Sequence, residues 1–529
     1  MNVAELVVSC LEREGVEHVF GVPGEETEDL LFALRDGDVT FVPVRHEQGA
    51  AFMANVHGRL TGDAGVCLGT LGPGATNLVT GVADANLDKA PLVALTGQGG
   101  LERLHKESHQ ALDVVQMFEP ITEWNTQLTD EAIVTESVRK AFKVAEHEKP
   151  GATHLELPED VAGEPVDADP MPQRDRVRHA APDPALADRA AELVTASERP
   201  LIIAGNGAVR TDAAAQLRSF VEATGIPVAS TYMGKGAVSD RSPRSLMTLD
   251  SGHHQEASDA IASSDLIVTV GYDIAEHDPA DWNAGEDTTV VHVDSEPAEV
   301  YEAYNPDLEL VCDLSLALAA IDDRVDPDDC ACDAEWYADL RQHIVEDVEA
   351  LRCEGEPFTV AGALPVLRDV LADEDVLISD VGSHKMRIAQ NYPTYEPNTC
   401  IISNGLASMG IAVPGGIAAD LAVDGEVVAA TGDGGFLMNG AELETATRMG
   451  CGFTVLLFND DDYGLISEKQ EAHRGDSTGT RLTNPDFTAL AESFGIDGYR
   501  PSGWDELEPT LREAVGSDGM ALVEVPLEP

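Results

Sequence analysis

The segment that most constrains the fold lies near the C-terminus, where two short apolar runs flank a glycine-rich turn and a helical stretch. The first run spans residues 427–430 and leads into Gly432-Asp433-Gly434-Gly435. Helically spaced residues follow as far as Met449, and the second run covers residues 453–458. This pattern predicts a strand, a tight turn, a helix and a buried strand, the repeating unit of a parallel α/β sheet.

The same segment predicts an anion and metal site. It delivers Asp433 and Asp460, 27 residues apart (460 − 433 = 27), to one carboxyl-end edge of the sheet. Glycines allow a phosphate to approach the backbone, and a helix N-terminus favours negative charge. Carboxylates beside a diphosphate suit Mg²⁺, which prefers a few carboxylates together with phosphate oxygens. The alternative for a lone Gly-Asp-Gly is an acidic surface turn after a Rossmann-type strand.

Gly432-Asp433-Gly434 followed by Asn459-Asp460 resembles the cofactor motif of thiamine diphosphate (ThDP) enzymes. The resemblance implies that Asp433, the side chain of Asp460 and the main-chain carbonyl of Asp462 hold Mg²⁺, and that Gly432, Gly434 and Gly435 bind the cofactor. The family usually has Asn where this chain has Asp460. That departure keeps an oxygen ligand but adds a charge, which bears on metal affinity and choice.

A second motif, Arg45-His46-Glu47-Gln48-Gly49, follows a strand-like run at residues 40–44 and opens a helix. Alone, a Glu at a helix start is often only a charge placed favourably against the helix dipole. With residues 20–24 before it and 72–77 after it, the region resembles the pyrimidine-binding domain of ThDP enzymes. The resemblance implies that Glu47 hydrogen-bonds N1′ of the aminopyrimidine and favours the tautomer that deprotonates thiazolium C2. Further cofactor contacts are implied for Pro23, Gly24, Gly72 and Asn77.

Composition describes an acidic but foldable chain. Its 529 residues are enough for about three domains, and 33 Lys and Arg against 96 Asp and Glu give a net charge of −63. Such a charge is typical of disorder, but 43% of residues are apolar and the acids are interspersed among them. We interpret the acidic surface as adaptation to high salt, where screening removes self-repulsion. It argues against nucleic acid and anionic membranes as partners.

Targeting signals and cysteine usage favour a cytoplasmic protein. No signal segment opens the sequence and no apolar run approaches membrane-spanning length, so we expect a cytoplasmic protein. Packed, unpaired thiols are expected beside apolar runs, at Cys10, Cys67, Cys312, Cys400 and Cys451.

Alternating strands and helices predict an α/β fold of three doubly wound parallel-sheet domains. We expect an N-terminal pyrimidine-binding domain at residues 1–166, a central Rossmann-like domain at 186–325 and a C-terminal diphosphate-binding domain at 355–529, an order that the ThDP resemblance also implies. Strands are predicted near residues 19–22, 39–43, 66–68, 91–95, 153–157, 201–204, 228, 266–270, 290–293, 376–379, 427–431, 453–458 and 521–525.

FAD is not expected in the central domain. Gly205-Asn206-Gly207 follows a predicted strand but lacks the third glycine of a dinucleotide-binding fingerprint. Residues 272–279 resemble instead the FAD-independent, catabolic type of acetolactate synthase.

Several other segments are similar to acetolactate synthases. Residues 106–113 and 118–122 resemble that subfamily, which implies that His109 and Gln110 face the reacting atoms; a polar loop is the alternative. Ser383 and His384 follow the first strand of the third domain and are implied to bind the diphosphate. Met409, in a loop at residues 403–410, is implied to hold ThDP in its bent shape.

The resemblance implies that the chain decarboxylates pyruvate and joins the hydroxyethyl-ThDP enamine to a second 2-oxoacid, giving 2-acetolactate and CO₂. Leu465 and Lys469 occupy positions where family members select the acceptor; a Lys there either binds an acidic acceptor or faces solvent. A 2-oxoacid decarboxylase releasing an aldehyde is the main alternative. A non-catalytic ThDP-binding paralogue is a weaker one, because it would be expected to lose Glu47 or Asp433.

The resemblance also implies an assembly. In this family the domain carrying Glu47 meets the domain carrying Asp433 of another chain, so we expect a homodimer or homotetramer with active sites between subunits. A small regulatory subunit remains open.

Overall fold

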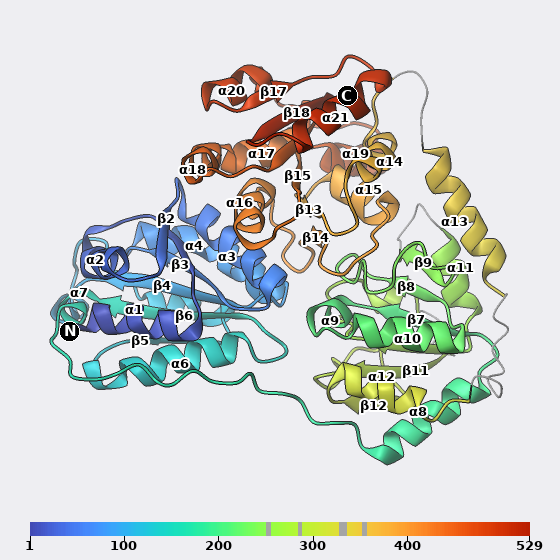
Figure 1. The fold of residues 1–529 in the computed structure, drawn as a ribbon, viewed down its shortest axis with the longest axis horizontal. Helices are drawn as coiled ribbons and strands as arrows, with labels where there is room; N and C mark the ends of the chain where they lie inside the picture. The colour runs from blue at the N-terminus through green and yellow to red at the C-terminus, as the bar shows by residue number, and fades with distance from the viewer. Residues whose placement is uncertain (250–254, 284–287, 327–335, 352–356, 529) are drawn as a thin grey trace. The chain divides into compact units, whose positions relative to one another are not determined.

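The structure is a computed structural model that describes residues 1–249, 255–283, 288–326, 336–351 and 357–528. It contains three six-stranded sheets flanked by helices (Figure 1), and the strand pairs run parallel. The predicted α/β class with three parallel sheets is confirmed. By internal contacts the chain forms two units: Met1–Val177 with Gly405–Arg500 and Ala514–Glu524, and Arg178–Asn404 with Pro501–Glu513 and Val525–Pro529.

The first sheet has the strand order β2-β1-β3-β4-β6-β5. Its strands are β1 (His18–Gly21), β2 (Thr40–Pro43), β3 (Gly65–Gly69), β4 (Leu92–Gln98), β5 (Trp124–Gln127) and β6 (Ala152–Pro158). Its helices are α1 (Val3–Glu14), η1 (Glu25–Thr27), α2 (Glu28–Asp36), α3 (Glu47–Thr61), α4 (Pro73–Leu87), η2 (Leu101–Arg103), α5 (Val114–Phe118), η3 (Glu119–Ile121), η4 (Glu131–Ile133), α6 (Val134–Ala145) and α7 (Glu159–Ala162).

The second sheet has the order β12-β11-β10-β7-β8-β9, the doubly wound order of Rossmann folds. Its strands are β7 (Pro200–Ala204), β8 (Val228–Ser230), β9 (Ser245–Thr248), β10 (Leu266–Val270), β11 (Thr289–Asp294) and β12 (Leu308–Val311). The associated helices are α8 (Pro184–Ala196), α9 (Asn206–Arg210), α10 (Ala214–Thr224), α11 (Gln255–Ser263), η5 (Pro279–Asp281), α12 (Leu314–Asp322) and α13 (Ala338–Ala350).

The third sheet, β14-β13-β15-β16-β18-β17, repeats the connectivity of the first. Its strands are β13 (Val376–Ser379), β14 (Cys400–Ile402), β15 (Val427–Gly432), β16 (Thr454–Asn459), β17 (Asp497–Tyr499) and β18 (Ala521–Pro526). Its helices are α14 (Val360–Val370), α15 (Ser383–Asn391), α16 (Ala412–Ala422), α17 (Asp433–Asn439), η6 (Gly440–Glu442), α18 (Leu443–Met449), α19 (Gly464–Arg474), α20 (Phe487–Ser493) and α21 (Trp504–Val515).

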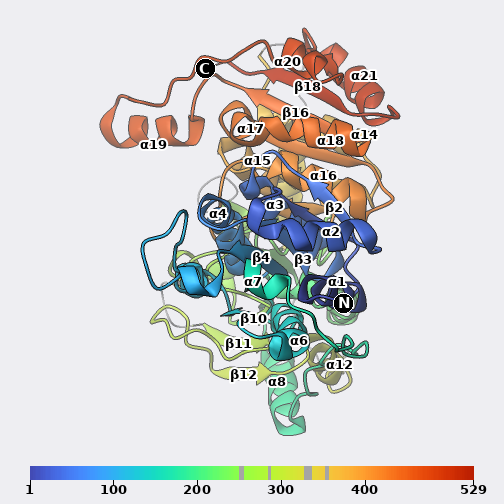
Figure 2. The same cartoon turned by 90° about the vertical axis from the view of Figure 1, so that its left-hand side faces the viewer.

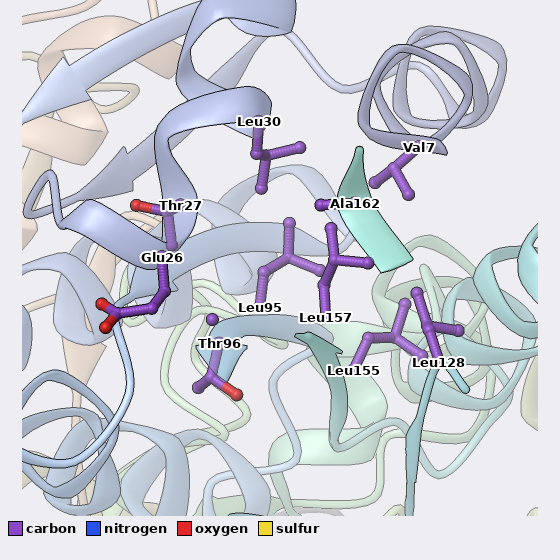
Figure 3. A pocket seen from close by; sticks show the side chains of 11 residues that line it. Val7, Glu26, Thr27, Leu30, Leu95, Thr96, Leu128, Leu155, Leu157 and Ala162 are labelled. Carbon is purple, nitrogen blue, oxygen red and sulfur yellow. The ribbon is translucent and has the colours of Figure 1, made fainter. Parts of the chain in front are cut away.

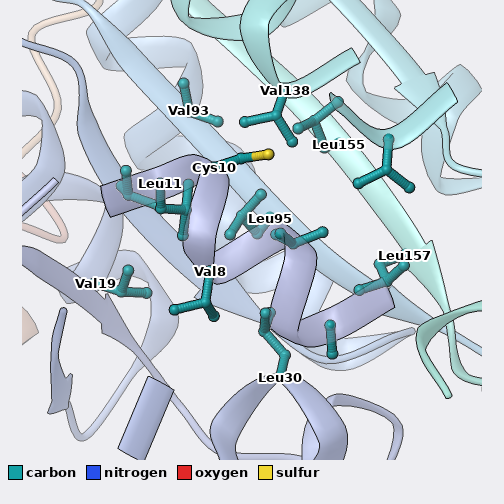
Figure 4. Close-up of a cluster of buried hydrophobic side chains, with 14 of the residues drawn as sticks. Val8, Cys10, Leu11, Val19, Leu30, Val93, Leu95, Val138, Leu155 and Leu157 are labelled. Atoms are coloured by element: carbon teal, nitrogen blue, oxygen red, sulfur yellow. The ribbon is translucent and has the colours of Figure 1, made fainter. Parts of the chain in front are cut away.

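The core of the first sheet shows how sequence pattern becomes structure. Helix α1 begins with a capping box between Asn2 and Glu5 and ends at Gly15, whose φ of 92° favours glycine. Its apolar stripe packs onto β4 and β6 with Leu95 and Leu155 (Figure 4). The five cysteines predicted to be packed thiols are all buried and unpaired.

Close helix packing positions the start of α3. Helices α3 and α4 contact one another, and α3 also contacts α16. At Gly81 an added Cβ would lie 2.5 Å from the Cβ of Ala51, so only glycine permits this approach. The view in Figure 2 shows α3 and α4 beside the first sheet. None of the described helices is long and apolar enough to cross a membrane.

Candidate active site

Glu47 is the first residue of α3 and is only 7% exposed, although it is a carboxylate in a very acidic chain. Its Oε2 accepts a hydrogen bond from Nδ2 of Asn77 on α4, at 2.9 Å. Near its other oxygen stands Gly74, where an added Cβ would lie 3.4 Å from Oε1. The carboxylate is therefore buried and held by Asn77 on one oxygen, with a glycine close to the other.

Glu442, at the end of η6, fixes the turn that presents Glu47. Its Oε1 accepts the backbone N–H groups of Arg45 and His46, each at 3.0 Å, and Oε2 accepts the hydroxyl of Thr445 at 2.6 Å. Burial raises the pKa of Glu442, and these hydrogen bonds counter the rise. An added Cβ at Gly49 would lie 2.8 Å from Oε1. Sequence reasoning did not identify this role of Glu442, because nothing in the local pattern signals a partner some 400 residues away.

The glycines predicted to contact the cofactor lie in tight backbone surroundings. An added Cβ at Gly24 would come within 2.3 Å of Thr70, and Pro23 beside it is exposed. Gly72 has φ of 55° and begins α4, where an added Cβ would lie 2.8 Å from the carbonyl oxygen of Gln110. The structure thus brings Gln110 against the helix that supplies Asn77.

His109 and Gln110 both lie on an exposed loop. Arg103 supports it: Nη1 pairs with Glu159 at 2.8 Å, Nε donates to Ser108 at 3.1 Å, and Nη2 donates to the carbonyl of His109 at 3.4 Å. Gln110 has φ of 55°, which is unusual for a non-glycine residue. The loop is therefore ordered by specific contacts, although its tip is open to solvent.

The two predicted metal-binding aspartates are brought together. Asp433 begins α17 and Asp460 follows β16, the neighbouring parallel strand. Their carboxyl groups hydrogen-bond to each other. Burial, and then the charge of Asp433, raises the pKa of Asp460 to about 7, and burial also raises the pKa of Asp433. Two carboxyl groups that share a proton form a set of hard oxygen donors that suits a divalent cation.

Asp462 contacts this site through its backbone and not through its side chain. Its N–H donates to Asp460 Oδ1 at 3.1 Å, while its carboxylate accepts the hydroxyl of Ser467 at 2.6 Å. The side chain is thereby turned toward α19. In the described part of the chain no three His, Cys, Asp or Glu side chains are grouped to hold a metal, so a complete coordination shell needs oxygens from backbone, water or phosphate.

Asn484 is a site residue that sequence reasoning missed. Its Nδ2 donates to Asp433 at 2.6 Å, to Asp461 at 2.8 Å and to Asn459 at 3.1 Å. It lies in an extended segment after α19 with no periodic pattern, so only the fold reveals it. An added Cβ at Gly434 would lie 2.6 Å from the ring of Tyr463, which explains the glycine there.

Met409 lies in a loop within the same unit as Asp433 and is partly buried. The loop is held by carboxylates of α4: Asp88 accepts the N–H of Gly405 at 2.7 Å, and Asp84 accepts that of Ser408 at 3.3 Å.

Ser383 and His384 belong to the other unit, at the start of α15. Gly382 precedes them with φ of 156°, and His384 is buried, which lowers its pKa to about 4. Helix α15 therefore presents backbone N–H groups at its N-terminus, an arrangement that favours anions, and the imidazole of His384 beside them is neutral at pH 7.

Leu465 and Lys469 lie on α19, where Leu465 is partly buried and Lys469 is exposed. Of the two readings for Lys469, the single chain shows the solvent-facing one.

In the central domain a carboxyl group engages the start of α9. The N–H of Asn206, at the start of α9, donates to both carboxylate oxygens of Glu276 at 3.0 Å. Glu276 is buried, and burial raises its pKa to about 8. The helix start that binds phosphate in Rossmann folds is thus engaged by a carboxyl group.

One hollow in the first sheet domain is no cofactor site. Figure 3 shows its walls, which are mostly apolar and include Leu30, Leu95, Leu155 and Leu157. It has room for about 10 Å³, roughly one water molecule.

Comparison with known proteins agrees with this geometry. Three family models match: the N-terminal, central and C-terminal domains of thiamine pyrophosphate enzymes, at residues 1–117, 187–321 and 380–525. The chain is 34% identical to the acetolactate synthase of Bacillus subtilis, covering 99% of this chain and 93% of that protein. It is 35% identical to the catabolic acetolactate synthase of Raoultella terrigena, covering 99% and 95%. It is 32% identical to the large subunit of acetolactate synthase isozyme 2 of Escherichia coli, covering 100% and 96%. The chain therefore belongs to the thiamine pyrophosphate (ThDP) enzyme family.

Proposed function

We propose that this enzyme is an acetolactate synthase that decarboxylates pyruvate and joins the two-carbon unit to a second 2-oxoacid. The observation that carries the proposal is the meeting of Gln110 with Gly72 on the helix whose Asn77 holds Glu47. This contact ties the loop that carries His109 and Gln110 to the start of α4, the helix that supplies Asn77. Full-length similarity to three acetolactate synthases supports the same reaction.

In this proposal the chain's own residues bind and orient. Glu47 would hold a proton at N1′ of the aminopyrimidine, while Asn77 keeps the carboxylate in place. Asp433, Asp460 and the carbonyl of Asp462 would hold Mg²⁺. The cofactor would also be bound by Pro23, Gly24, Gly72, Gly432, Gly434, Gly435, Ser383, His384 and Met409. ThDP, when bound, supplies the carbon nucleophile and accepts the electrons released on decarboxylation.

The substrate side of the proposal rests on His109 and Gln110, with Leu465 and Lys469 near the acceptor. His109 and Gln110 can donate hydrogen bonds to a carboxylate or to a developing alkoxide, the stabilisation that such a step needs.

The test is product analysis with pyruvate, ThDP and Mg²⁺ in concentrated KCl. Acetolactate, measured as acetoin after acid decarboxylation, is the expected product. Acetaldehyde alone would replace the proposal with a 2-oxoacid decarboxylase. A reaction lacking ThDP is the control, and competition between pyruvate and 2-oxobutyrate then defines the acceptor.

We also propose that active sites form between subunits of a homodimer or homotetramer. Four large apolar side chains of one unit are 40–47% exposed: Leu87, Leu406, Leu437 and Met438. Gly405, the neighbour of Leu406, lies against Leu87, so two of these side chains belong to one surface region. Sedimentation of an active monomer would contradict this assembly. Because the Escherichia coli relative is named a large subunit, co-purification is the test for a small subunit.

We propose three further properties of this protein. The domains are taken as residues 1–166, 186–325 and 355–529; the central family match at 187–321 supports the second, and the matches at 1–117 and 380–525 lie within the other two. A cytoplasmic location is supported by five buried, unpaired thiols. The absence of FAD is supported by the Glu276 carboxyl group at the start of α9; FAD absorbance in the purified protein would contradict it.

A further inference from the structure

Three polar side chains meet at one end of the first sheet. Gln98 ends β4, Gln127 ends β5, and Glu156 lies on β6, which is between them in the strand order. The register pairs Glu156 with Gln127 on one side and with Thr96 on the other. Gln98 and Glu156 are each only 1% exposed.

Both carboxylate oxygens of Glu156 are hydrogen-bonded within this group. Glu156 Oε1 accepts from Nε2 of Gln98 at 2.7 Å, and Oε2 accepts from Nε2 of Gln127. Burial raises the pKa of Glu156 to about 7, the two glutamines lower it, and Asp113 raises it further. A buried carboxyl group with two amide donors is costly unless both bonds are made.

Gln98 also closes a loop. Its Oε1 accepts the N–H of Gly99 at 3.0 Å, and its Nε2 donates to the carbonyl of Leu112 at 3.0 Å. One amide thus ties both ends of residues 99–112, using its oxygen and both N–H groups. Glu156 fixes which way the amide faces, because only Nε2 can donate to a carboxylate.

That loop carries His109 and Gln110. Its far side is held by Arg103, which contacts Glu159 and the carbonyl of His109. Between these anchors Gln110 keeps its φ of 55° against Gly72. The loop is therefore clamped at its ends by Gln98 and at its middle by Arg103.

We propose that Glu156 and Gln98 are positioning residues, which act by orienting the Gln98 amide so that the loop at residues 99–112 presents His109 and Gln110 to a 2-oxoacid. The assignment rests on the proposed function for the identity of that substrate. Neither residue touches substrate: Glu156 acts through Gln98, and Gln98 acts through the Leu112 carbonyl.

A purely structural role for Gln98 and Glu156 would be to hold β4 and β6 together. Exchanging the amide and the carboxylate between these two positions separates that role from the positioning of the loop. Q98E places two carboxyl groups side by side and removes the donor to Leu112. The double variant Q98E/E156Q restores an amide–carboxylate hydrogen bond between β4 and β6. The amide oxygen at position 156 can still accept the hydrogen bond from Gln127. It does not restore the donor to Leu112, because a carboxylate cannot donate.

Hydrogen exchange measured by mass spectrometry on the ThDP-loaded protein at pH 8 reads the loop directly. We expect faster exchange across residues 99–113 in both variants, whereas the melting temperature recovers in the double variant. The kcat/KM for pyruvate should fall by about 10- to 100-fold in both, with ThDP affinity unchanged, since misplacing a contact by about 1 Å costs that much. If loop exchange and kcat/KM return to parental values in the double variant, Gln98 and Glu156 serve only to hold β4 and β6 together. That result would overturn the proposal.

T96V is the matched control. It breaks the buried Thr96–His154 hydrogen bond, 2.8 Å long, between the same two strands, and neither residue bonds to the loop. It should leave loop exchange unchanged. If the parent protein does not turn over pyruvate, the proposed function fails. The positioning role of Gln98 and Glu156 is then decided by loop exchange alone. Unchanged loop exchange in Q98E would overturn it.

Discussion

At the scale of single residues, Glu47 differs from most carboxylates of this acidic chain because it is buried and has a fixed partner. Asn77 holds one oxygen, and Glu442 holds the turn before it. A carboxylate held in this way is suited to exchange a proton with one ligand atom.

Replacing Glu47 by Gln should therefore leave ThDP binding intact and abolish most of the turnover. We expect ThDP affinity within about threefold of the parent, because Gln can still accept from Asn77, and a kcat lower by about 10²- to 10⁴-fold, the usual value of general acid–base catalysis. Exchange of the C2 proton of bound ThDP, followed by NMR, is the decisive measurement. Parental exchange rates in the variant would remove Glu47 from the mechanism.

The Asp433–Asp460 pair predicts a pH effect on the metal-free protein. The folded pair keeps a proton up to about pH 7, whereas the unfolded carboxyl groups release theirs near pH 4. The folded state thus binds more protons between these values, so the free energy of unfolding falls as pH rises through that window. D460N removes the repulsion and should be more stable than the parent at pH 8, on the order of 1 kcal/mol after allowing for solvent screening of a partly exposed pair.

Thermal melts in EDTA from pH 4 to 8 check this prediction. The melting temperature of D460N should change less with pH than that of the parent. Added Mg²⁺ should reduce the difference in melting temperature between D460N and the parent at pH 8, because a bound cation offsets the repulsion between the two carboxylates of the parent. Parallel melting curves for the two proteins would contradict the shared proton.

At the scale of elements, the sequence predicted the interiors of the sheets better than their edges. Thirteen strands were anticipated near their observed positions, and those missed all lie at sheet edges within the described part of the chain. They are β5, β9, β12, β14 and β17. Edge strands are covered less completely, so β5, β12 and β17 lack the apolar run that marks a buried parallel strand. The predicted helix after Gly434 is in fact broken by η6, which the helical spacing did not reveal.

The candidate site divides in the same way. Asp433 and Asp460 were found because strand, turn and helix follow one another locally, and Glu47 was found through the resemblance of its region to the pyrimidine-binding domain of ThDP enzymes. Glu442 and Asn484 were not, because each acts on residues distant in the chain, and only the folded contacts identify them. Local order is readable from sequence, whereas long-range hydrogen bonds are not.

Close packing of α3 and α4 gives a prediction about an element pair. G81A adds a methyl group 2.5 Å from the Cβ of Ala51, so the helices must move apart. We expect a loss of about 1–3 kcal/mol in the free energy of unfolding and weaker ThDP binding, because Asn77 and Glu47 lie on these two helices. G519A is the control, since an added Cβ there meets nothing within 4 Å. Equal denaturation midpoints for the two variants would contradict the packing argument.

At the scale of the whole molecule, the number of cationic residues limits how many carboxylates can form ion pairs, whatever the arrangement of the side chains. If every one of the 33 Lys and Arg paired with one carboxylate, 63 of the 96 Asp and Glu would still have no cationic partner (96 − 33 = 63). Repulsion therefore exceeds attraction in sum, although individual pairs such as Glu14 with Arg139 and Arg174 are well buried.

Added salt should consequently stabilise this protein. Screening shortens the range of charge interactions from about 10 Å at 0.1 M to about 3 Å at 1 M, which weakens the repulsion among exposed carboxylates more than the attraction within buried pairs. We expect the melting temperature to rise steadily from 0.1 to 3 M KCl. E14Q should lower the melting temperature at every salt concentration, because Glu14 is only 5% exposed and its pairs with Arg139 and Arg174 are screened little. A melting temperature that falls as KCl increases would mean that ion pairs, not net charge, control stability, and the acidic surface would then need a different explanation.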